Sequence, residues 1–248
     1  DPVMVQYGRY LGNLLQGNMG QSITSRTPVL DEIAARFPAT LELAALGMLM
    51  TVVVAVPLGV FAAIKRGSLF DNVLMAGALF GVSIPSFWFG VMVILVFGLW
   101  LGWLPISGRG DGPIYQRLEY LVLPSLTLAI GLMGIVSRMV RSSVIEVLGL
   151  DYIRTARAKG LKSRTVLVRH AIRNALIPVI TIMGLQFAGL LGGAIIIETI
   201  FAWPGIGRLA VNAIWRRDYP VIMGTVLIFS FTFILANLLV DILYTVLD

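Results

Sequence analysis

The stretch that decides the fold is Leu41–Ile64, which reads LELAALGMLMTVVVAVPLGVFAAI and contains one charged residue, Glu42. This stretch is longer than the roughly 20 apolar residues that an α-helix needs to cross the hydrocarbon core of a bilayer. Lipid offers the backbone no hydrogen-bond partners, so a segment that lies in lipid must satisfy its own N–H and C=O groups. The stretch therefore predicts a transmembrane helix.

Four further apolar stretches follow it along the chain. They run over Val73–Leu101, Leu121–Val136, Ala175–Ile197 and Val221–Tyr244. The second stretch is long enough to bend, and Pro85 inside it gives a cause for a bend. None alternates between polar and apolar residues as the strands of an outer-membrane barrel do. We expect an all-α, polytopic transmembrane helical bundle with five spans.

The composition supports lipid as the solvent for most of the surface. Apolar residues make up 58% of the chain and charged residues 13%, whereas soluble domains carry about 25% charged residues. The chain has no cysteine and one histidine, which argues against disulfides and against a conventional metal site. We therefore predict no metal ligands. In a membrane protein, a net charge of +6 is explained by basic cytoplasmic loops, so we expect contact with membrane lipid and not with nucleic acid.

The basic residues also predict the orientation. Eleven of the 19 lysines and arginines, including all three lysines, fall in the connections 65–72 and 137–174. Cytoplasmic loops are enriched in these residues, so we place both connections inside, the amino end outside and the carboxyl end inside. We expect residues 1–39 to form an extracytoplasmic segment and residues 40–248 the transmembrane domain. Asp1 stands where an initiator methionine would, and we expect a sixth span in the intact chain.

The cytoplasmic connection contains the most informative motif, Asp151–Gly160, with the sequence DYIRTARAKG. Apolar positions before and after it recur at helical spacing, and Gly160 is a typical residue just beyond a helix end. The motif predicts a short basic helix lying across the membrane surface. Such a helix can dock in a groove of a partner protein, or it can bind anionic lipid head groups. The residue pattern alone leaves both alternatives open.

Several blocks of sequence resemble one transporter family. They are residues 152–160, then RHAIRNALIP at 169–178, ETIFAWPGIGRL at 198–209, RDYPV at 217–221 and GWLP at 102–105. These blocks are similar, in the same order, to the permeases of ABC importers, and within them to the dipeptide, oligopeptide and nickel family. Arg154-Thr155-Ala156 stands where the wider superfamily has Glu-Ala-Ala, and Arg173 falls where it has a proline. Both departures are typical of the peptide subfamily.

The resemblance implies a fold, a function and partners. The fold is that of a type I importer permease, and the function is ATP-driven import of small peptides such as dipeptides, oligopeptides or glutathione, with nickel or a metal chelate as the alternative. The partners are a second, homologous permease, two ATPase subunits and an extracytoplasmic substrate-binding protein. The chain itself is not an enzyme and needs no cofactor, because ATP and Mg are bound by the ATPase subunits. The phosphate-binding pattern of an ATPase is indeed absent, since no glycine is followed directly by lysine.

The resemblance also assigns the loop 137–174 as the coupling loop that sits in a cleft of the ATPase. The residues expected to couple the two proteins are Asp151, Tyr152, Arg154, Thr155, Ala156, Arg157, Ala158, Lys159 and Gly160. Gly160 permits the turn that directs the short helix. The loop must fit its cleft and be rigidly connected to the spans if closure of the ATPase pair is to move the membrane helices.

Two further sets of residues are candidates for transport. In the loop 199–220, Trp203-Pro204-Gly205 is a turn signal before a pattern typical of a half-buried re-entrant helix. This loop is a candidate external gate or binding-protein contact, or it is an interfacial helix anchored by Trp203 and Trp215. Ser83 and Gln186 lie near the middle of apolar stretches and are candidates for the translocation pathway. The alternative for both is a hydrogen bond between helices.

Two other classes of function compete with an importer. A membrane hydrolase requires a serine–histidine or paired-aspartate arrangement at depth, and we find none. A passive channel would work without any ATPase. Uptake that depends on ATP would separate an importer from a channel.

Overall fold

The computed structural model describes residues 2–110 and 112–247. Within these residues the regular structure is helical, apart from one isolated bridge between Gln21 and Pro28. The α-helices are α1 (Val3–Leu15), α2 (Val29–Ile64), α3 (Leu69–Ser83), α4 (Ser86–Val93), α5 (Ile114–Leu148), α6 (Asp151–Ala158), α7 (Ser163–Thr165), α8 (Arg173–Ile200), α9 (Ile206–Arg216) and α10 (Tyr219–Leu247). Two π-helical turns, η1 (Ile94–Trp100) and η2 (Val166–Ile172), continue α4 and lead into α8. The predicted all-α bundle is confirmed.

The long helices account for the predicted spans. In the described part of the chain, α2, α5, α10 and the run from Ser163 into α8 are each long and apolar enough to cross a membrane. The pair α3 and α4 makes a fifth span if it is counted as one, with a bend of 102° between its halves. The bend lies at Ile84 and Pro85, where the sequence predicts one. A proline removes a backbone donor and disfavours helical geometry in the residue before it.

The helices extend beyond the apolar stretches from which they are predicted. The third stretch, Leu121–Val136, lies within the 35-residue helix α5, and Pro124 lies inside that helix. The first stretch begins twelve residues after the start of α2 at Val29. Hydropathy detects only the part of a helix that faces lipid, whereas the helix itself continues into water where its polar residues can be solvated. The predicted boundary between residues 39 and 40 lies inside α2, and the division of the chain there stays a prediction.

The core is built around α5, which packs against α2, α3 and α8. Small residues allow the backbones to approach closely. A Cβ atom on Gly59 of α2 would lie 2.6 Å from the carbonyl oxygen of Ser137, and one on Gly134 would lie 2.4 Å from that of Ala78. Such contacts are typical of helices that pack in membranes. The resulting cluster continues through Val140 and Val144 to α6.

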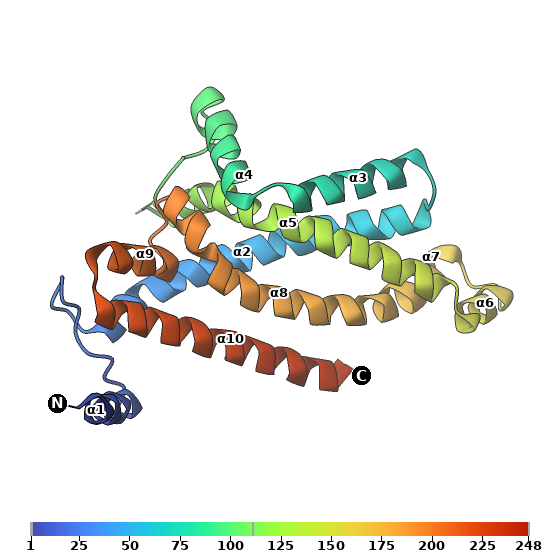
Figure 1. Ribbon diagram of the computed structural model, residues 1–248. Helices are drawn as coiled ribbons and strands as arrows, with labels where there is room; N and C mark the ends of the chain where they lie inside the picture. The colour runs from blue at the N-terminus through green and yellow to red at the C-terminus, as the bar shows by residue number, and fades with distance from the viewer. Residues whose placement is uncertain (1, 111, 248) are drawn as a thin grey trace.

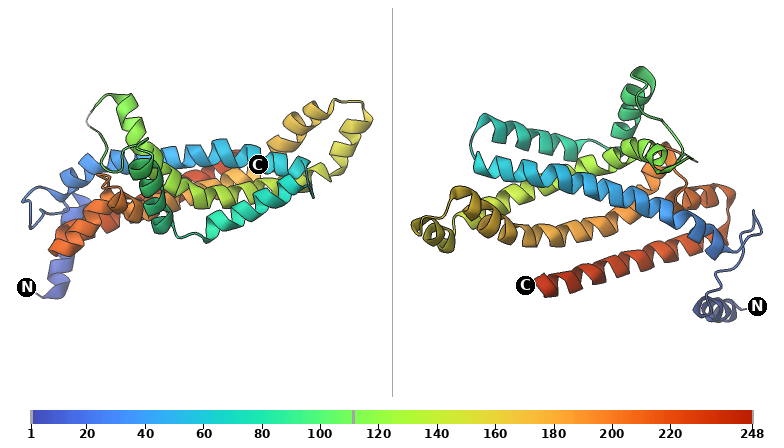
Figure 2. Two further views of the ribbon diagram at one scale, coloured as in Figure 1. Left: turned by 90° about the horizontal axis from the view of Figure 1, so that it is seen from above. Right: turned by 180° about the vertical axis from the view of Figure 1, so that it is seen from behind.

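The bundle is elongated and its two ends differ (Figure 1). The short helix α6 lies beyond the long helices at one end, here called the α6 end. At the other, the α9 end, lie α9 and the amino-terminal segment with α1, and α4 projects away from the bundle near that end. The two additional views show the same separation (Figure 2). The coupling residues of α6 and the candidate gate residues before α9 therefore lie at opposite ends of the molecule.

Candidate functional site

The predicted basic helix is present as α6, and its end has the expected geometry. The helix runs from Asp151 to Ala158, and Gly160 follows with φ +77°. The N–H of Gly160 donates to the carbonyl of Arg157 (2.9 Å), and the N–H of Leu161 donates to that of Ala156 (3.4 Å). This pair of bonds is a Schellman motif, which requires a left-handed residue at the position of Gly160. The turn that ends α6 therefore depends on the glycine.

One side of α6 is packed against the bundle. Ile153 and Ala156 are buried, in a cluster with residues of α5 and η2 such as Val144, Val147 and Val166. Tyr152 adds a polar link, because its hydroxyl accepts from the side chain of Asn174 (2.8 Å) and donates to the carbonyl of His170 (3.2 Å). Residues 153 and 156 are three apart, so they lie on the same face of the helix. α6 is thus fixed to the helices on both sides of it.

The opposite side of α6 is exposed and mostly basic. Of the nine residues predicted for coupling, the structure exposes all but Ala156: Asp151, Tyr152, Arg154, Thr155, Arg157, Ala158, Lys159 and Gly160. Asp151 pairs with Arg154 (3.2 Å), an exposed contact of little energetic weight. Arg157 and Lys159 are exposed cations without an ion-pair partner among the described residues. The structure therefore brings the predicted residues together on one short helix and separates Ala156 from the surface.

A partly buried ion pair that the sequence did not predict joins α3 and α5 toward the α6 end. Arg141 of α5 donates from Nε and Nη2 to the carboxylate of Asp71 in α3, with the second contact at 2.7 Å. The N–H of Gly67 donates to the same carboxylate (2.9 Å). A bidentate arginine–carboxylate pair fixes orientation as well as distance. Asp71 therefore ties the turn before α3 to the helix that carries α6.

At the α9 end, Glu198 organises the loop that precedes α9. Its buried carboxylate accepts from the hydroxyl of Thr40 (2.7 Å) and from the N–H of Arg208 (2.9 Å), with a further bond from the N–H of Gly207. These N–H groups belong to the first turn of α9. The N–H groups of a first turn have no hydrogen-bond partners within their own helix. A carboxylate is stabilised at that position by the helix dipole. Glu198 therefore caps α9 from the end of α8.

The motif Trp203-Pro204-Gly205 lies beside this carboxylate. Trp203 is fully buried, and its Nε1 donates to the carbonyl of Ala39 (2.8 Å). A Cβ on Gly205 would lie 2.1 Å from Oε1 of Glu198, so the position has no room for a side chain. Pro204 is exposed. In this structure only Pro204 of the three presents a surface to a partner, and the predicted gate or binding-protein contact stays a prediction.

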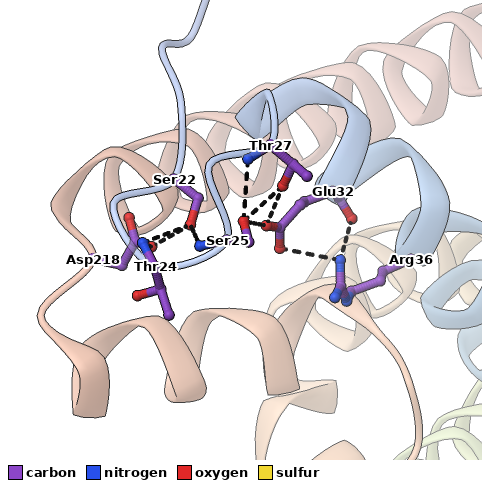
Figure 3. Close-up of polar contacts among 7 residues, drawn as sticks. All are labelled: Ser22, Thr24, Ser25, Thr27, Glu32, Arg36 and Asp218. Atoms are coloured by element: carbon purple, nitrogen blue, oxygen red, sulfur yellow. Dashed lines mark hydrogen bonds and ion pairs between the residues drawn. The ribbon is translucent and has the colours of Figure 1, made fainter.

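A second polar network joins the loop before α2 to Asp218, the residue before α10 (Figure 3). Asp218 accepts from the hydroxyl of Ser22 and from the N–H groups of Ile23 and Thr24, both at 3.1 Å. Burial raises the pKa of Asp218, but the three hydrogen bonds outweigh it and hold the pKa below its ordinary value. The carboxylate is therefore charged at neutral pH and fastens the loop to the α9–α10 junction.

The predicted pathway residues are not brought together. Ser83 is the last residue of α3, is exposed, and donates to the carbonyl of Leu79 one turn earlier (2.9 Å). Gln186 is half-buried in α8. Among the described residues, no hydrogen bond joins the two side chains. Their assignment to the pathway stays a prediction.

The roles of Glu198 and Asp71 could not be read from the sequence. Glu198 was recognisable as an acidic residue at the end of an apolar stretch. Ser68-x-x-Asp71 has the spacing of a helix start, and in the structure the N–H of Asp71 donates to the hydroxyl of Ser68 (3.3 Å). Neither pattern shows which distant residue is the partner. Thr40 and Arg141 are ordinary residues in the sequence and acquire their roles through packing.

Comparison with solved structures supports the fold. The chain is similar to a subunit of the MetNI methionine ABC transporter in inward-facing crystal structures, with a TM-score of 0.73 and 16% identity over 88% of this chain and 96% of that chain. It is also similar to a chain of an amino acid ABC transporter, with a TM-score of 0.63 and 15% identity over 87% of this chain and 94% of that one. At this level of identity the likeness concerns the fold alone, which is that of a type I ABC importer permease.

Comparison of sequences shows closer relatives. The chain is 45% identical to the di/tripeptide transport system permease protein DppB of Pseudomonas aeruginosa over 98% of its own length and 79% of that protein. It is 43% identical to the dipeptide transport system permease protein DppB of Escherichia coli K12, over all of this chain and 80% of the relative. It is 45% identical to the glutathione transport system permease protein GsiC of the same strain, over all of this chain and 79% of the relative.

The family comparison agrees with both. Residues 55–248 match the family described as the binding-protein-dependent transport system inner membrane component. Its members are permease subunits and not catalytic ones, and they lie in the inner membrane, in agreement with the apolar helices described above. The chain belongs to this family, the membrane-spanning permease subunits of ABC importers.

Proposed function

We propose that this permease imports small peptides of the dipeptide, tripeptide or glutathione class. The observation that carries the proposal is the identity of 43–45% to peptide and glutathione permeases over essentially the whole chain. The same relatives give no support to nickel as the substrate. Arg154-Thr155-Ala156 in the coupling helix and Arg173 after it also resemble the peptide subfamily.

The proposal assigns α6 as the coupling helix and the α6 end as cytoplasmic. Eight of the nine predicted residues are exposed on α6, and of these Tyr152 also contacts the bundle through its hydroxyl. The buried side of α6 joins a cluster that includes α2, α5 and α8. A force on α6 therefore reaches three of the long helices without passing through a flexible linker. The partner of α6 is an ATPase subunit, and closure of two such subunits, which bind ATP and Mg, moves the bundle.

The remaining assembly follows from the same proposal. The α9 end faces outward, where an extracytoplasmic binding protein delivers the substrate. A second, homologous permease completes the pathway, to which Ser83 and Gln186 contribute. The loop before α9, with Trp203, Pro204 and Gly205, closes the outer side of this pathway.

Reconstitution tests the proposal. The permease is placed in proteoliposomes with its cognate second permease, ATPase subunits and binding protein. Uptake of labelled dipeptide, tripeptide and glutathione is then followed with and without ATP. We expect uptake of at least one of these peptides, only when ATP and the binding protein are both present. Uptake without ATP would identify a channel, and ATP-dependent uptake of Ni²⁺ in preference to every peptide would overturn the substrate class.

A variant of α6 tests the coupling. Arg157→Glu reverses a charge on the exposed side, where no described carboxylate pairs with it. We expect loss of ATPase binding and of uptake, because the partner's groove then faces the wrong charge. Arg9→Glu in α1 is the control, since it makes the same charge change at the opposite end of the molecule. Equal loss in both variants would count against α6 as the docking element.

A further inference from the structure

A cavity of about 350 Å³ lies at the α9 end of the molecule. It is formed by the loop before α2, the first turns of α2, the exposed side of α9 and the start of α10. The polar network of Figure 3 makes up one of its walls. The α9 wall of the cavity is contributed by Arg208, Asn212 and Arg216, which are four residues apart along α9 and so lie on one face of that helix.

The two acidic groups of the cavity are already occupied. Asp218 accepts three hydrogen bonds from the loop at Ser22, Ile23 and Thr24. Glu32 accepts from the hydroxyls of Ser25 and Thr27 and pairs with Arg36 at 3.3 Å. Both carboxylates therefore face protein donors, and little of their acceptor capacity remains for a visiting group.

The donors on the α9 wall are in the opposite situation. Arg208 uses Nη1 to bond the carbonyl of Ala202 (2.6 Å), and it forms no ion pair with a carboxylate in the described part of the chain. Arg216 and Asn212 are exposed, and neither side chain has a hydrogen-bond or ion-pair partner within residues 2–110 and 112–247. An arginine has five N–H donors and no acceptor. The wall therefore offers cationic donors to a group that carries negative charge.

The cavity is also rigid, which lowers the entropic cost of binding. The loop is fastened at Ser22 by Asp218 and at Gly20, whose carbonyl accepts from the N–H of Val29 (3.0 Å). The first turn of α9 is held by Glu198, as described above. Its apolar side is buried through Ile206 and Leu209 against α2 and α10. The donors on α9 are therefore presented from a fixed backbone.

We propose that this cavity receives an acidic side chain from the extracytoplasmic binding protein when that protein docks. The inference rests on the proposed function, which places the α9 end outside, and on a family whose description names dependence on a binding protein. The positive charge of Arg208 and Arg216 favours a carboxylate as the ligand. The position of the cavity on the outer surface of α9 favours a docking protein as its source. Arg216 is the primary contact because its guanidinium is exposed and uncommitted, and Arg208 and Asn212 complete the site from the same face.

Binding measurements on the complete transporter in nanodiscs test the proposal, with the labelled binding protein as the probe. Arg216→Glu places a negative charge in the cavity and Arg216→Gln removes the positive one without adding an acid. We expect about tenfold weaker binding for Arg216→Glu, a smaller loss for Arg216→Gln, and a weaker dependence of affinity on salt in both. Arg217→Glu is the matched control, because Arg217 is exposed next to Arg216 but does not line the cavity. We expect less than about a twofold change for it, because its side chain lies outside the cavity and an exposed charge pair contributes little binding energy.

Three further measurements separate the outcomes. Replacement of the contacting acidic residue of the binding protein by arginine is expected to restore the affinity of Arg216→Glu. An equal loss in Arg216→Glu and Arg217→Glu, or no loss in either, overturns the proposal. A change in KM for peptides with a free carboxyl terminus compared with amidated peptides, at unchanged affinity for the binding protein, overturns it in favour of a substrate carboxylate. In the Arg216 variants, basal ATPase activity without the binding protein is expected to stay unchanged. Failure of the proposed function would appear differently, as absent ATP-dependent uptake in the unaltered transporter.

Discussion

The hydroxyl of Thr40 donates to Oε1 of Glu198 at 2.7 Å, and this bond joins residues that are 158 positions apart in the chain. Thr40 lies in α2 and Glu198 near the end of α8. The same threonine oxygen accepts from the N–H of Ile206 (2.9 Å), the first residue of α9. Two side chains thereby position the start of the helix that carries Arg208 and Arg216.

Removal of the Glu198 carboxylate is expected to destabilise this end of the molecule. In Glu198→Ala the hydroxyl of Thr40 and the N–H of Arg208 lose their buried acceptor, which costs about 1–3 kcal/mol for each unsatisfied group. We expect a lower melting temperature of the purified transporter, measured by the change in tryptophan fluorescence. Glu198→Gln keeps one acceptor oxygen, so we expect its melting temperature to lie between those of Glu198→Ala and the unaltered protein. Equal melting of Glu198→Ala and the unaltered protein would show that water replaces the carboxylate.

The two alanines of α6 are expected to respond differently to enlargement. Ala156 is buried against the bundle and Ala158 is exposed. Ala156→Leu inserts three carbon atoms into a packed cluster, which costs about 1–3 kcal/mol. We expect it to lower the melting temperature of the permease even in the absence of the ATPase subunits.

Ala158→Leu is the matched variant on the same helix. Its added atoms face away from the bundle, so we expect the stability of the permease alone to be unchanged while binding of the ATPase subunits weakens. The two measurements thus distinguish a residue that seats α6 from one that contacts the partner. A loss of permease stability in Ala158→Leu would contradict the exposed position of that residue.

Gly160 is expected to tolerate only residues that adopt the left-handed conformation. Its φ of +77° lies outside the range available to proline, and its N–H bonds the carbonyl of Arg157. Gly160→Pro therefore removes the bond and the turn together, whereas Gly160→Asn keeps both at a smaller cost. We expect Gly160→Pro to abolish peptide uptake while ATP hydrolysis persists, and Gly160→Asn to retain most of the uptake. Normal uptake in Gly160→Pro would exclude a mechanical role for the end of α6.

Acid is expected to loosen the loop before α2 through Asp218. The pKa of this carboxyl is lowered in the folded protein, so the folded state favours the charged form. The resulting stability is fully present above the ordinary pKa of aspartate, about 3.9, and is lost as the pH falls through that value and then through the lower folded value. We expect protection of the N–H groups of Ile23 and Thr24 from hydrogen exchange to decrease in this range.

Asp218→Asn provides the comparison for the pH profile. It is expected to expose the same N–H groups at neutral pH and to show little further change on acidification. Asp31→Asn changes an exposed acid near the same loop and is expected to keep the acid-dependent loss. A pH profile unaffected by Asp218→Asn would assign the effect to another group.

Much of the fold and part of the candidate site could be predicted from the sequence. The spans, the break at Pro85 and the end of the basic helix before Gly160 all follow from local properties: apolar length, a missing backbone donor and a positive φ. The extent of α5 could not be predicted in this way, because hydropathy stops at Val136 where the helix continues to Leu148. The burial of Ala156 was also missed, since small residues suit both a packed face and a docking surface.

The sequence by itself determined that this protein crosses the membrane as helices and carries a basic helix between two of its spans. These properties depend on neighbouring residues, because lipid forces each apolar segment to satisfy its own backbone. Only the tertiary structure decided that Glu198 caps α9, that Asp218 holds the loop at Ser22, 196 positions away, and that Arg216 is left without a partner within the described residues. Polar partners across such distances depend on which helices pack together and at what height, and a linear pattern of residues contains neither.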